Sequence, residues 1–191
     1  MKILDIDENN IKELRAGLSG RLKDFLRCKF LVIEEEDGKI IGASGIGGFF
    51  NVHGIELLEN ARGKGLGKAL FSKNIEEAKR RGYSFILASR NPTNKVIVKL
   101  HDFFGFRRIF RIHYTQDMVR EVIILVLRPR GKIVEKILRI FNTVTGTAIL
   151  SIGLKISKSF LFTKLLAYDP NRFPNPEIKS IIKNFEKISE K

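Results

Sequence analysis

A basic, glycine-rich segment is the part of this sequence best suited to chemistry. It reads Asn60-Ala61-Arg62-Gly63-Lys64-Gly65-Leu66-Gly67-Lys68, and apolar residues recur at helical spacing from Leu66 onward. Alternating glycines let a backbone approach a ligand closely and adopt positive φ angles. A helix N-terminus offers free N–H groups and a dipole that favour an anion. With the charges of Arg62, Lys64 and Lys68, the segment predicts a pyrophosphate-binding loop.

Two familiar phosphate-binding motifs do not describe this segment. A P-loop needs a Gly-x-x-x-x-Gly-Lys-Ser/Thr spacing, and Ala69 stands where the hydroxyl would be. The dinucleotide fingerprint needs Gly-x-Gly-x-x-Gly, whereas the glycines here strictly alternate. A flexible basic turn that binds nothing is the remaining alternative.

The elements around the loop alternate between strand and helix patterns. Strands are expected at 3–6, 30–35, 39–46, 52–58, 83–88, 106–114 and 119–127. Helices are expected from Asn9 or Asn10 to Leu18, over 21–28 and 67–81, and from Pro92 to about Phe104. This order predicts an α+β fold with helices packed on a mixed sheet.

Two motifs together resemble the GNAT acetyltransferase superfamily. Arg62-x-x-Gly65-x-Gly67, after a strand and opening a helix, resembles its acetyl-CoA motif, and Asn94-x-x-Ile97-x-x-Leu100-His101-x-x-x-Gly105-Phe106 is similar to its second motif. The resemblance spans roughly residues 2–128. It implies a GNAT-like mixed, mostly antiparallel sheet flanked by helices. We therefore predict an acetyltransferase domain over 1–128 and a basic, mainly helical extension over 129–191.

The resemblance also implies a co-substrate and the residues that bind it. Acetyl-CoA would be the acetyl donor, and no metal is expected. Leu57 and Leu58 would offer backbone groups to the pantetheine arm, and Asn94 would lie near the pantetheine and the acceptor channel. Asn94 could instead only cap a helix or turn. The pyrophosphate would be bound largely by backbone N–H groups of Arg62, Gly63, Lys64, Gly65, Leu66 and Gly67, with Lys68 adding positive charge.

The catalytic residues are less well specified. His101 stands where the family often has a tyrosine that protonates the leaving thiolate, and the seven-residue spacing from Asn94 puts both on one face of a helix. A histidine has a reference pKa of about 6.5, so it is mostly neutral at neutral pH. Glu56 is the candidate base that deprotonates the amine, with His53 on the same strand as the alternative. Structural roles remain open for all three residues.

The C-terminal extension lies outside the resemblance. Arg128-Pro129-Arg130-Gly131 marks a boundary, and apolar residues then recur at helical spacing, although Gly146, Gly153 and the Thr-rich stretch 143–147 argue against one continuous helix. A short tail helix is expected over 178–188. The extension could pack on the catalytic domain, form a homodimer, or contact an anionic membrane, which we favour less.

Composition indicates the cellular compartment and the kinds of partner that the protein could have. The net charge is +14 over 191 residues, and residues 130–191 hold 12 Lys/Arg against 5 Asp/Glu. The single cysteine, Cys28, cannot form an internal disulfide, and the longest uncharged run, 140–154, is shorter than the roughly 18 residues that a spanning helix needs. These features predict a cytoplasmic protein, and no known nucleic-acid module is evident.

Three functional hypotheses follow. The first is an N-acetyltransferase that transfers the acetyl group from acetyl-CoA to a primary amine by direct attack, since no Cys or Ser lies in an evident nucleophile motif. The second is a CoA-binding module without catalysis, suggested by His101 at the position of the family's tyrosine. The third is a basic protein that binds nucleic acid or a membrane surface.

Overall fold

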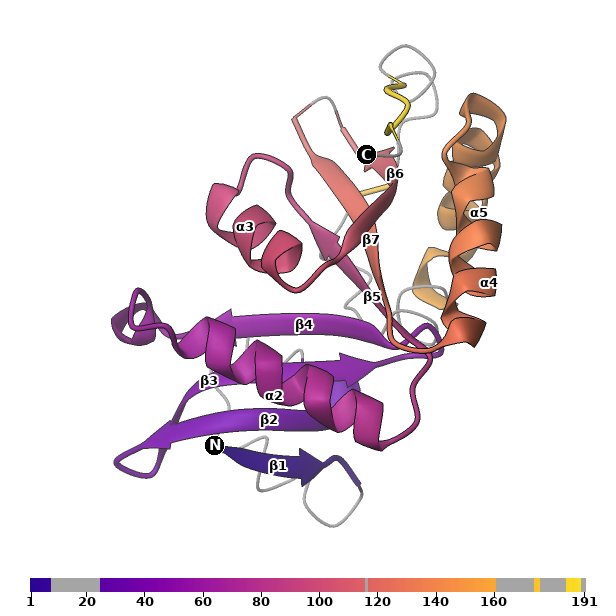
Figure 1. Ribbon diagram of the computed structural model, residues 1–191. Coiled ribbons are helices and arrows are strands. Elements are labelled where there is room, and N and C mark those ends of the chain that lie inside the picture. Colours follow the sequence, from indigo (N-terminus) through magenta and orange to yellow (C-terminus); the bar gives the residue numbers. More distant parts are fainter. Residues whose placement is uncertain (8–24, 116, 161–173, 176–184, 190–191) are drawn as a thin grey trace. The chain divides into compact units, whose positions relative to one another are not determined.

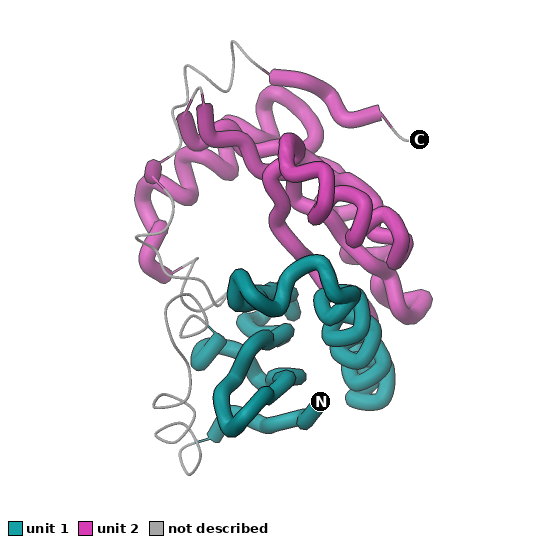
Figure 2. Tube along the Cα trace, turned by 90° about the vertical axis from the view of Figure 1, so that its left-hand side faces the viewer, with its two compact units in different colours: residues 1–83, 163–168 teal, residues 84–162, 169–191 magenta. Residues whose placement is uncertain are grey.

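The computed structural model describes residues 1–7, 25–115, 117–160, 174–175 and 185–189 (Figure 1). Contacts divide these residues into two compact units (Figure 2). The first lies within residues 1–83, and the second within 84–160 together with the described C-terminal residues. The candidate loop belongs to the first unit, and the Asn94–Phe106 motif belongs to the second.

The first unit is built on an antiparallel meander. Its strands pair in chain order: β1 (Lys2–Asp5), β2 (Cys28–Glu36), β3 (Lys39–Gly47) and β4 (Val52–Leu57). Asp37 and Gly38, both at positive φ, make the tight turn between β2 and β3, as the Asp-Gly pair predicts. The meander ends at a short 3₁₀ turn, η2 (Glu59–Ala61), which leads into the glycine loop.

Helix α2 (Leu66–Arg80) covers one face of this meander and contacts β2, β3 and β4. Its apolar stripe supplies Leu70 and Phe71, both fully buried, to the core. The opposite face of the sheet has its own cluster of Phe25, Leu31, Ile33, Ile40 and Ala43. Apolar packing thus covers both faces of the meander, close to the point where β4 ends and the loop begins.

The second unit contains a three-stranded antiparallel sheet with the order β5-β7-β6. Its strands are β5 (Phe85–Arg90), β6 (Arg107–His113) and β7 (Val119–Val126), and helix α3 (Lys95–Phe103) connects β5 to β6. Helix α4 (Pro129–Leu138) follows β7 and packs against β5 and β7. A 3₁₀ turn, η3 (Arg139–Phe141), then leads into α5 (Val144–Phe160).

Two glycines allow the C-terminal helices to pack closely. A Cβ atom at Gly131 would lie 2.3 Å from the Ser84 carbonyl oxygen, so α4 can approach β5 only with glycine there. A Cβ atom at Gly146 would lie 2.3 Å from the Ile140 carbonyl oxygen at the break between η3 and α5. That break confirms the prediction that the apolar extension is not one continuous helix.

The predicted class, α+β with a mostly antiparallel sheet and a helical C-terminal extension, is confirmed. The boundary predicted between 128 and 129 stays a prediction, and α4 packs within the second unit. The helix expected over 9–18 and most of the one expected over 21–28 lie outside the described residues.

Three predicted boundaries are wrong. Cys28 begins β2 instead of ending a helix, because its backbone pairs with Gly47. Helix α3 begins at Lys95, not at Pro92, because Asn94 caps it. Residues 185–188, expected at the end of a tail helix, are not helical; Ile188 exchanges two hydrogen bonds with the Asn142 side chain.

Candidate active site

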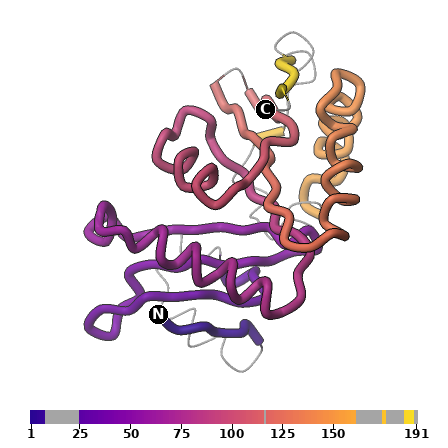
Figure 3. The backbone as a smooth tube through the Cα atoms, in the orientation of Figure 1, coloured from indigo at the N-terminus to yellow at the C-terminus, as the bar shows by residue number. Residues whose placement is uncertain are grey.

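The glycine loop joins β4 to α2 within the first unit (Figure 3). Gly63 and Gly65 adopt φ angles of +78° and +77°, which L side chains rarely adopt. Gly65 is also the N-cap of α2, so no side chain caps this helix end. The alternating glycines therefore bend the backbone sharply and open the helix N-terminus toward solvent.

The loop presents a row of backbone donors. Hydrogen bonds within the backbone use the N–H groups of Ala61, Arg62, Lys68 and Ala69. The N–H groups of residues 63–67, by contrast, make no hydrogen bond to any residue that the structure describes. Residues 62–65 are exposed, and the N-terminal end of the α2 dipole adds a partial positive charge. This arrangement fits an anionic group such as a pyrophosphate.

Arg62 fastens the loop to the end of β4. Its Nε and Nη2 atoms donate to the Leu57 carbonyl oxygen at 3.3 and 3.2 Å. Nη2 also lies 3.2 Å from Oε1 of Glu56. Arg62 therefore orders the loop in addition to contributing charge, while more than half of its side chain stays exposed to solvent.

The backbone groups of Leu57 and Leu58, predicted to contact the pantetheine, already make hydrogen bonds within the protein. The Leu57 carbonyl accepts from Arg62, and the Leu58 N–H donates to the Ile41 carbonyl at 2.9 Å. The Leu58 carbonyl accepts from the Ala61 N–H at 3.0 Å. Pantetheine contacts by Leu57 and Leu58 remain predictions.

The two base candidates lie on opposite faces of the sheet. His53 is buried on the α2 side, where its ring stacks on Phe71 with centroids 4.0 Å apart and its Nε2 lies 2.8 Å from the Ser44 hydroxyl. Glu56, three residues further along β4, points to the other face because side chains alternate along a strand. This geometry favours a core role for His53 and leaves Glu56 as the accessible candidate.

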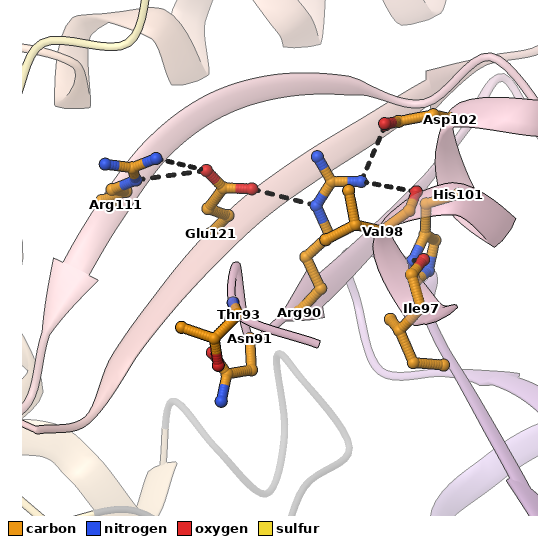
Figure 4. Close-up of polar contacts among 9 residues, drawn as sticks. All are labelled: Arg90, Asn91, Thr93, Ile97, Val98, His101, Asp102, Arg111 and Glu121. Atoms are coloured by element: carbon orange, nitrogen blue, oxygen red, sulfur yellow. Dashed lines mark hydrogen bonds and ion pairs between the residues drawn. The ribbon is translucent and has the colours of Figure 1, made fainter. Parts of the chain in front are cut away.

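Asn94 acts as a helix cap. Its Oδ1 accepts a hydrogen bond from the Ile97 N–H at 3.2 Å, and its backbone is not helical. The preceding turn is closed by Asn91, whose Oδ1 accepts from the Thr93 N–H at 3.0 Å (Figure 4). Since Asn94 precedes the helix, the argument that it shares a helical face with His101 does not hold. A role in binding acetyl-CoA stays a prediction.

His101 is buried inside the second unit, only 3% exposed. Its Nδ1–H donates to the Ile97 carbonyl at 2.9 Å (Figure 4). Its ring packs edge-on against Phe106. Burial lowers the pKa of His101 to about 4, against a smaller opposing effect of the Ile97 hydrogen bond. A neutral, buried imidazole is a poor proton donor at neutral pH. These features favour packing, and an acid role stays a prediction.

The second unit contains a buried ion-pair network that the sequence did not predict. Arg90 at the end of β5 is 2% exposed; its Nε donates to Glu121 at 3.0 Å and its Nη1 to Asp102 at 2.8 Å (Figure 4). Arg111 on β6 binds the other oxygen of Glu121 at 2.8 Å. The network ties β5, β6, β7 and α3 together directly before the Asn91–Asn94 turn. Charged residues within or at the ends of the predicted strands were the signal that could have revealed it.

The predicted site residues thus form two groups. The first unit brings together Glu56, Leu57, Leu58 and the loop 62–68. The second unit holds Asn94 and His101 at the two ends of α3. Among the described residues, no group of three or more His, Cys, Asp or Glu side chains could hold a metal ion.

Comparisons with solved structures found proteins of similar fold. The structure of ribosomal-protein-alanine N-acetyltransferase from Brucella melitensis aligns with 66% of this chain and all of that chain, at 18% identity and a TM-score of 0.52. The ribosomal-protein-S18-alanine N-acetyltransferase from Escherichia coli aligns with 66% of this chain and 94% of that chain, at 16% identity and a TM-score of 0.52.

A third structure has a lower score. The GNAT superfamily phosphinothricin acetyltransferase from Sinorhizobium meliloti, solved with acetyl-CoA, aligns with 51% of this chain, at 24% identity and a TM-score of 0.47. The match spans 60% of that protein, less than two thirds of its length. No curated protein sequence matches the chain.

Membership of a family rests on a sequence comparison. The model of the acetyltransferase (GNAT) family matches residues 6–106, a segment that contains β4, the glycine loop, α2 and the Asn94–Phe106 motif. The match covers more than half of the sequence, and the chain therefore belongs to the GNAT family of acetyltransferases.

Proposed function

We propose that this protein transfers an acetyl group from acetyl-CoA to a primary amine by direct attack on the thioester. The observation that carries the proposal is the row of backbone N–H groups at residues 63–67, at the N-terminus of α2 in a GNAT-family chain. A pyrophosphate accepts several hydrogen bonds and carries negative charge, so it matches this row. Exposed Lys64 and Lys68 add favourable charge at the loop.

The reaction needs the amine in its neutral form. An alkylammonium group with a pKa of about 10.4 must lose a proton before its nitrogen can attack the carbonyl carbon. Glu56 is the proposed acceptor of that proton, directly or through a water molecule. Its carboxylate is partly exposed and is held beside the loop by Arg62 at 3.2 Å. The C–S bond then breaks, and the CoA thiolate leaves with the electron pair and takes up a proton.

Protonation of the thiolate does not require His101. A thiol has a reference pKa of about 8.5, so the leaving thiolate is readily protonated by solvent near neutral pH. This route agrees with the burial of His101 and with its pKa of about 4.

A second candidate function is a CoA-binding module without catalysis. The observation that favours it is the same burial of His101, which leaves the second motif without an evident proton donor at that position. The two candidates share the loop and differ in turnover, so a kinetic measurement separates them.

The test follows CoA thiol release from acetyl-CoA over a panel of amines. The panel holds polyamines, lysine peptides and a peptide with an N-terminal alanine, because two of the structurally similar proteins are ribosomal-protein-alanine N-acetyltransferases by name. We expect at least one amine to stimulate thiol release, and Glu56→Gln to lower kcat by about a hundredfold or more. Glu59→Gln, an exposed neighbour on η2, is the matched control and should retain kcat.

Two results would count against this assignment. Acetyl-CoA binding without thiol release for any amine would support the non-catalytic module. Thiol release that is equal in wild type and Glu56→Gln would remove Glu56 from the mechanism while leaving the acetyltransferase function in place.

A further inference from the structure

Both helices of the C-terminal extension expose a row of large apolar side chains. On α4 the buried residues are Gly131 and Glu135, one small and one charged, whereas Ile133 and Ile137 are exposed. Glu135 is buried because it pairs with Arg107 and, at 3.0 Å, with Arg139. The helix contacts its unit through Gly131, the ion pairs of Glu135 and the half-buried Val134 and Leu138, whereas its isoleucines face outward.

Helix α5 repeats the pattern. Its buried residues are Gly146, Thr147, Ser151 and Leu154, three of them small or polar. The hydroxyls of Thr147 and Ser151 donate to backbone carbonyls of the preceding turn, so the buried face satisfies its own polar groups. The exposed face carries Ile149, Ile152 and Ile156, spaced three and four residues apart on one side of the helix.

The exposed apolar surface continues across the break between the helices, where Ile140 and Val144 are also exposed. We call the whole set the isoleucine face; its side chains are 42% to 79% exposed and comprise Ile133, Ile137, Ile140, Val144, Ile149, Ile152 and Ile156. Exposed apolar patches of this kind mark protein or membrane interaction sites.

The surroundings of the isoleucine face are basic. Residues 128–160 contain seven Lys/Arg and one acidic residue, Glu135, a net charge of +6. Glu135 is buried in its ion pairs, whereas Lys132, Lys136 and Lys155 are exposed on the same helices. An apolar surface with cationic flanks and no exposed acidic side chain of its own has the chemistry of a helix bound at an anionic lipid interface.

Length and composition fit an interfacial position. Within the described residues no single helix is long and apolar enough to cross a membrane. The pair Pro129–Phe141 and Val144–Phe160 meets that test only when taken together, and its two parts are bent by 92°. A short amphipathic helix can lie in the plane of a bilayer with its apolar side chains below the headgroups.

We propose that the isoleucine face binds an anionic lipid surface, with α4 and α5 lying in the interface and Lys132, Lys136 and Lys155 contacting lipid headgroups. A second copy of the chain is the less suitable occupant, because it would bring two segments of charge +6 against each other. The proposal does not depend on acetyl transfer, since it rests on residues 128–160 alone.

The experiment is cosedimentation of the full chain with two kinds of vesicle, pure phosphatidylcholine and phosphatidylcholine with about one third phosphatidylglycerol. We expect at least tenfold stronger partitioning onto the anionic vesicles, weakened by salt. Ile149→Gln combined with Ile156→Gln should lower partitioning about a hundredfold, since each buried isoleucine contributes about tenfold or more. Both side chains are exposed in the structure, so the fold should tolerate the change.

The matched control replaces two exposed apolar residues of α3, Val96→Gln combined with Phe103→Gln, and should retain vesicle binding. Three outcomes would overturn the proposal: no binding to either vesicle, binding that the Ile149/Ile156 variant retains, or a concentration-dependent dimer in sedimentation that only this variant dissociates. The last outcome would assign the isoleucine face to a second copy.

Discussion

His101 and His53 show how burial changes what a residue can do. Both histidines occur where the sequence allows chemistry, and both are placed inside a unit, against Phe106 and Phe71 respectively. Burial penalises the charged imidazolium, so the imidazole of His101 stays neutral. A sequence gives the type and spacing of a residue but not its burial, so it did not show that these two histidines are buried.

The lowered pKa of His101 makes stability depend on pH. The unfolded chain has a pKa of about 6.5 and the folded chain about 4, so between these values the unfolded state binds more protons. The stabilisation from the neutral imidazole is complete above about pH 6.5 and is lost as pH falls toward about 4. The expected loss at about pH 4.5 is roughly 2–3 kcal/mol.

Denaturant unfolding of wild type and His101→Gln at about pH 7.5 and pH 4.5 measures this effect. The wild type should lose about 2–3 kcal/mol more than the variant, because glutamine does not titrate. His113, whose pKa burial also lowers, remains in both proteins and cancels in the difference. Equal losses in the two proteins would mean that His101 is not held neutral.

The ion-pair network around Arg90 also could not be predicted from the sequence, because its partners are distant along the chain. Arg90 and Glu121 are 31 residues apart, and only the register of β5 on β7 places them opposite each other. A buried charge is costly unless it is paired, so each of these residues requires its partners. The sequence shows charged residues in segments with strand patterns, but which of them pair depends on how the strands pair.

At the scale of elements, variants of Asn94 at the start of α3 distinguish a helix-capping role from a ligand-binding role. Asn94→Ala should destabilise the protein by about 1 kcal/mol, because the Ile97 N–H loses its acceptor. Asn94→Asp keeps an acceptor oxygen and should restore most of the stability. If acetyl-CoA affinity, measured by calorimetry, falls in both variants, Asn94 binds the ligand directly; if it falls only in the alanine variant, Asn94 acts through the cap.

The docking of α4 depends on Gly131. Gly131→Ala should destabilise the protein by about 1–3 kcal/mol, because the new methyl group would meet the Ser84 carbonyl and force the helix away from β5. Gly153→Ala on α5 is the matched control: nothing lies within 4 Å of its Cβ position, so alanine should be neutral or stabilising by up to about 1 kcal/mol. Thermal unfolding compares them, and equal effects would contradict the close contact.

Elements were predictable where local patterns specify them. The alternation of β2 to β4, the Asp37-Gly38 turn and the stripe of α2 each rest on a few adjacent residues. The outward orientation of the isoleucines on α4 and α5 was not predictable in this way. Apolar residues lie on more than one side of α4, and the contacts of Gly131 and Glu135 decide which side is buried.

At the scale of the whole molecule, the family match and the basic helical segment lie in different parts of the chain. The GNAT match ends at residue 106, whereas residues 128–160 carry a net charge of +6 in a chain of +14. The resemblance read from the two motifs predicted the family and the fold. It says nothing about the extension, whose chemistry follows from its own exposed isoleucines and lysines.

The central claim is that the glycine loop binds acetyl-CoA, and calorimetric titration of the full chain tests it most directly. We predict micromolar affinity for acetyl-CoA, weaker binding of ATP and NAD, and at least a tenfold loss of affinity in Gly65→Trp. Gly38→Trp, at a similar φ of +72° with equal open space in the β2–β3 hairpin, controls for backbone strain and should bind normally. No binding by the wild type, or equal binding by Gly65→Trp, would contradict the assignment.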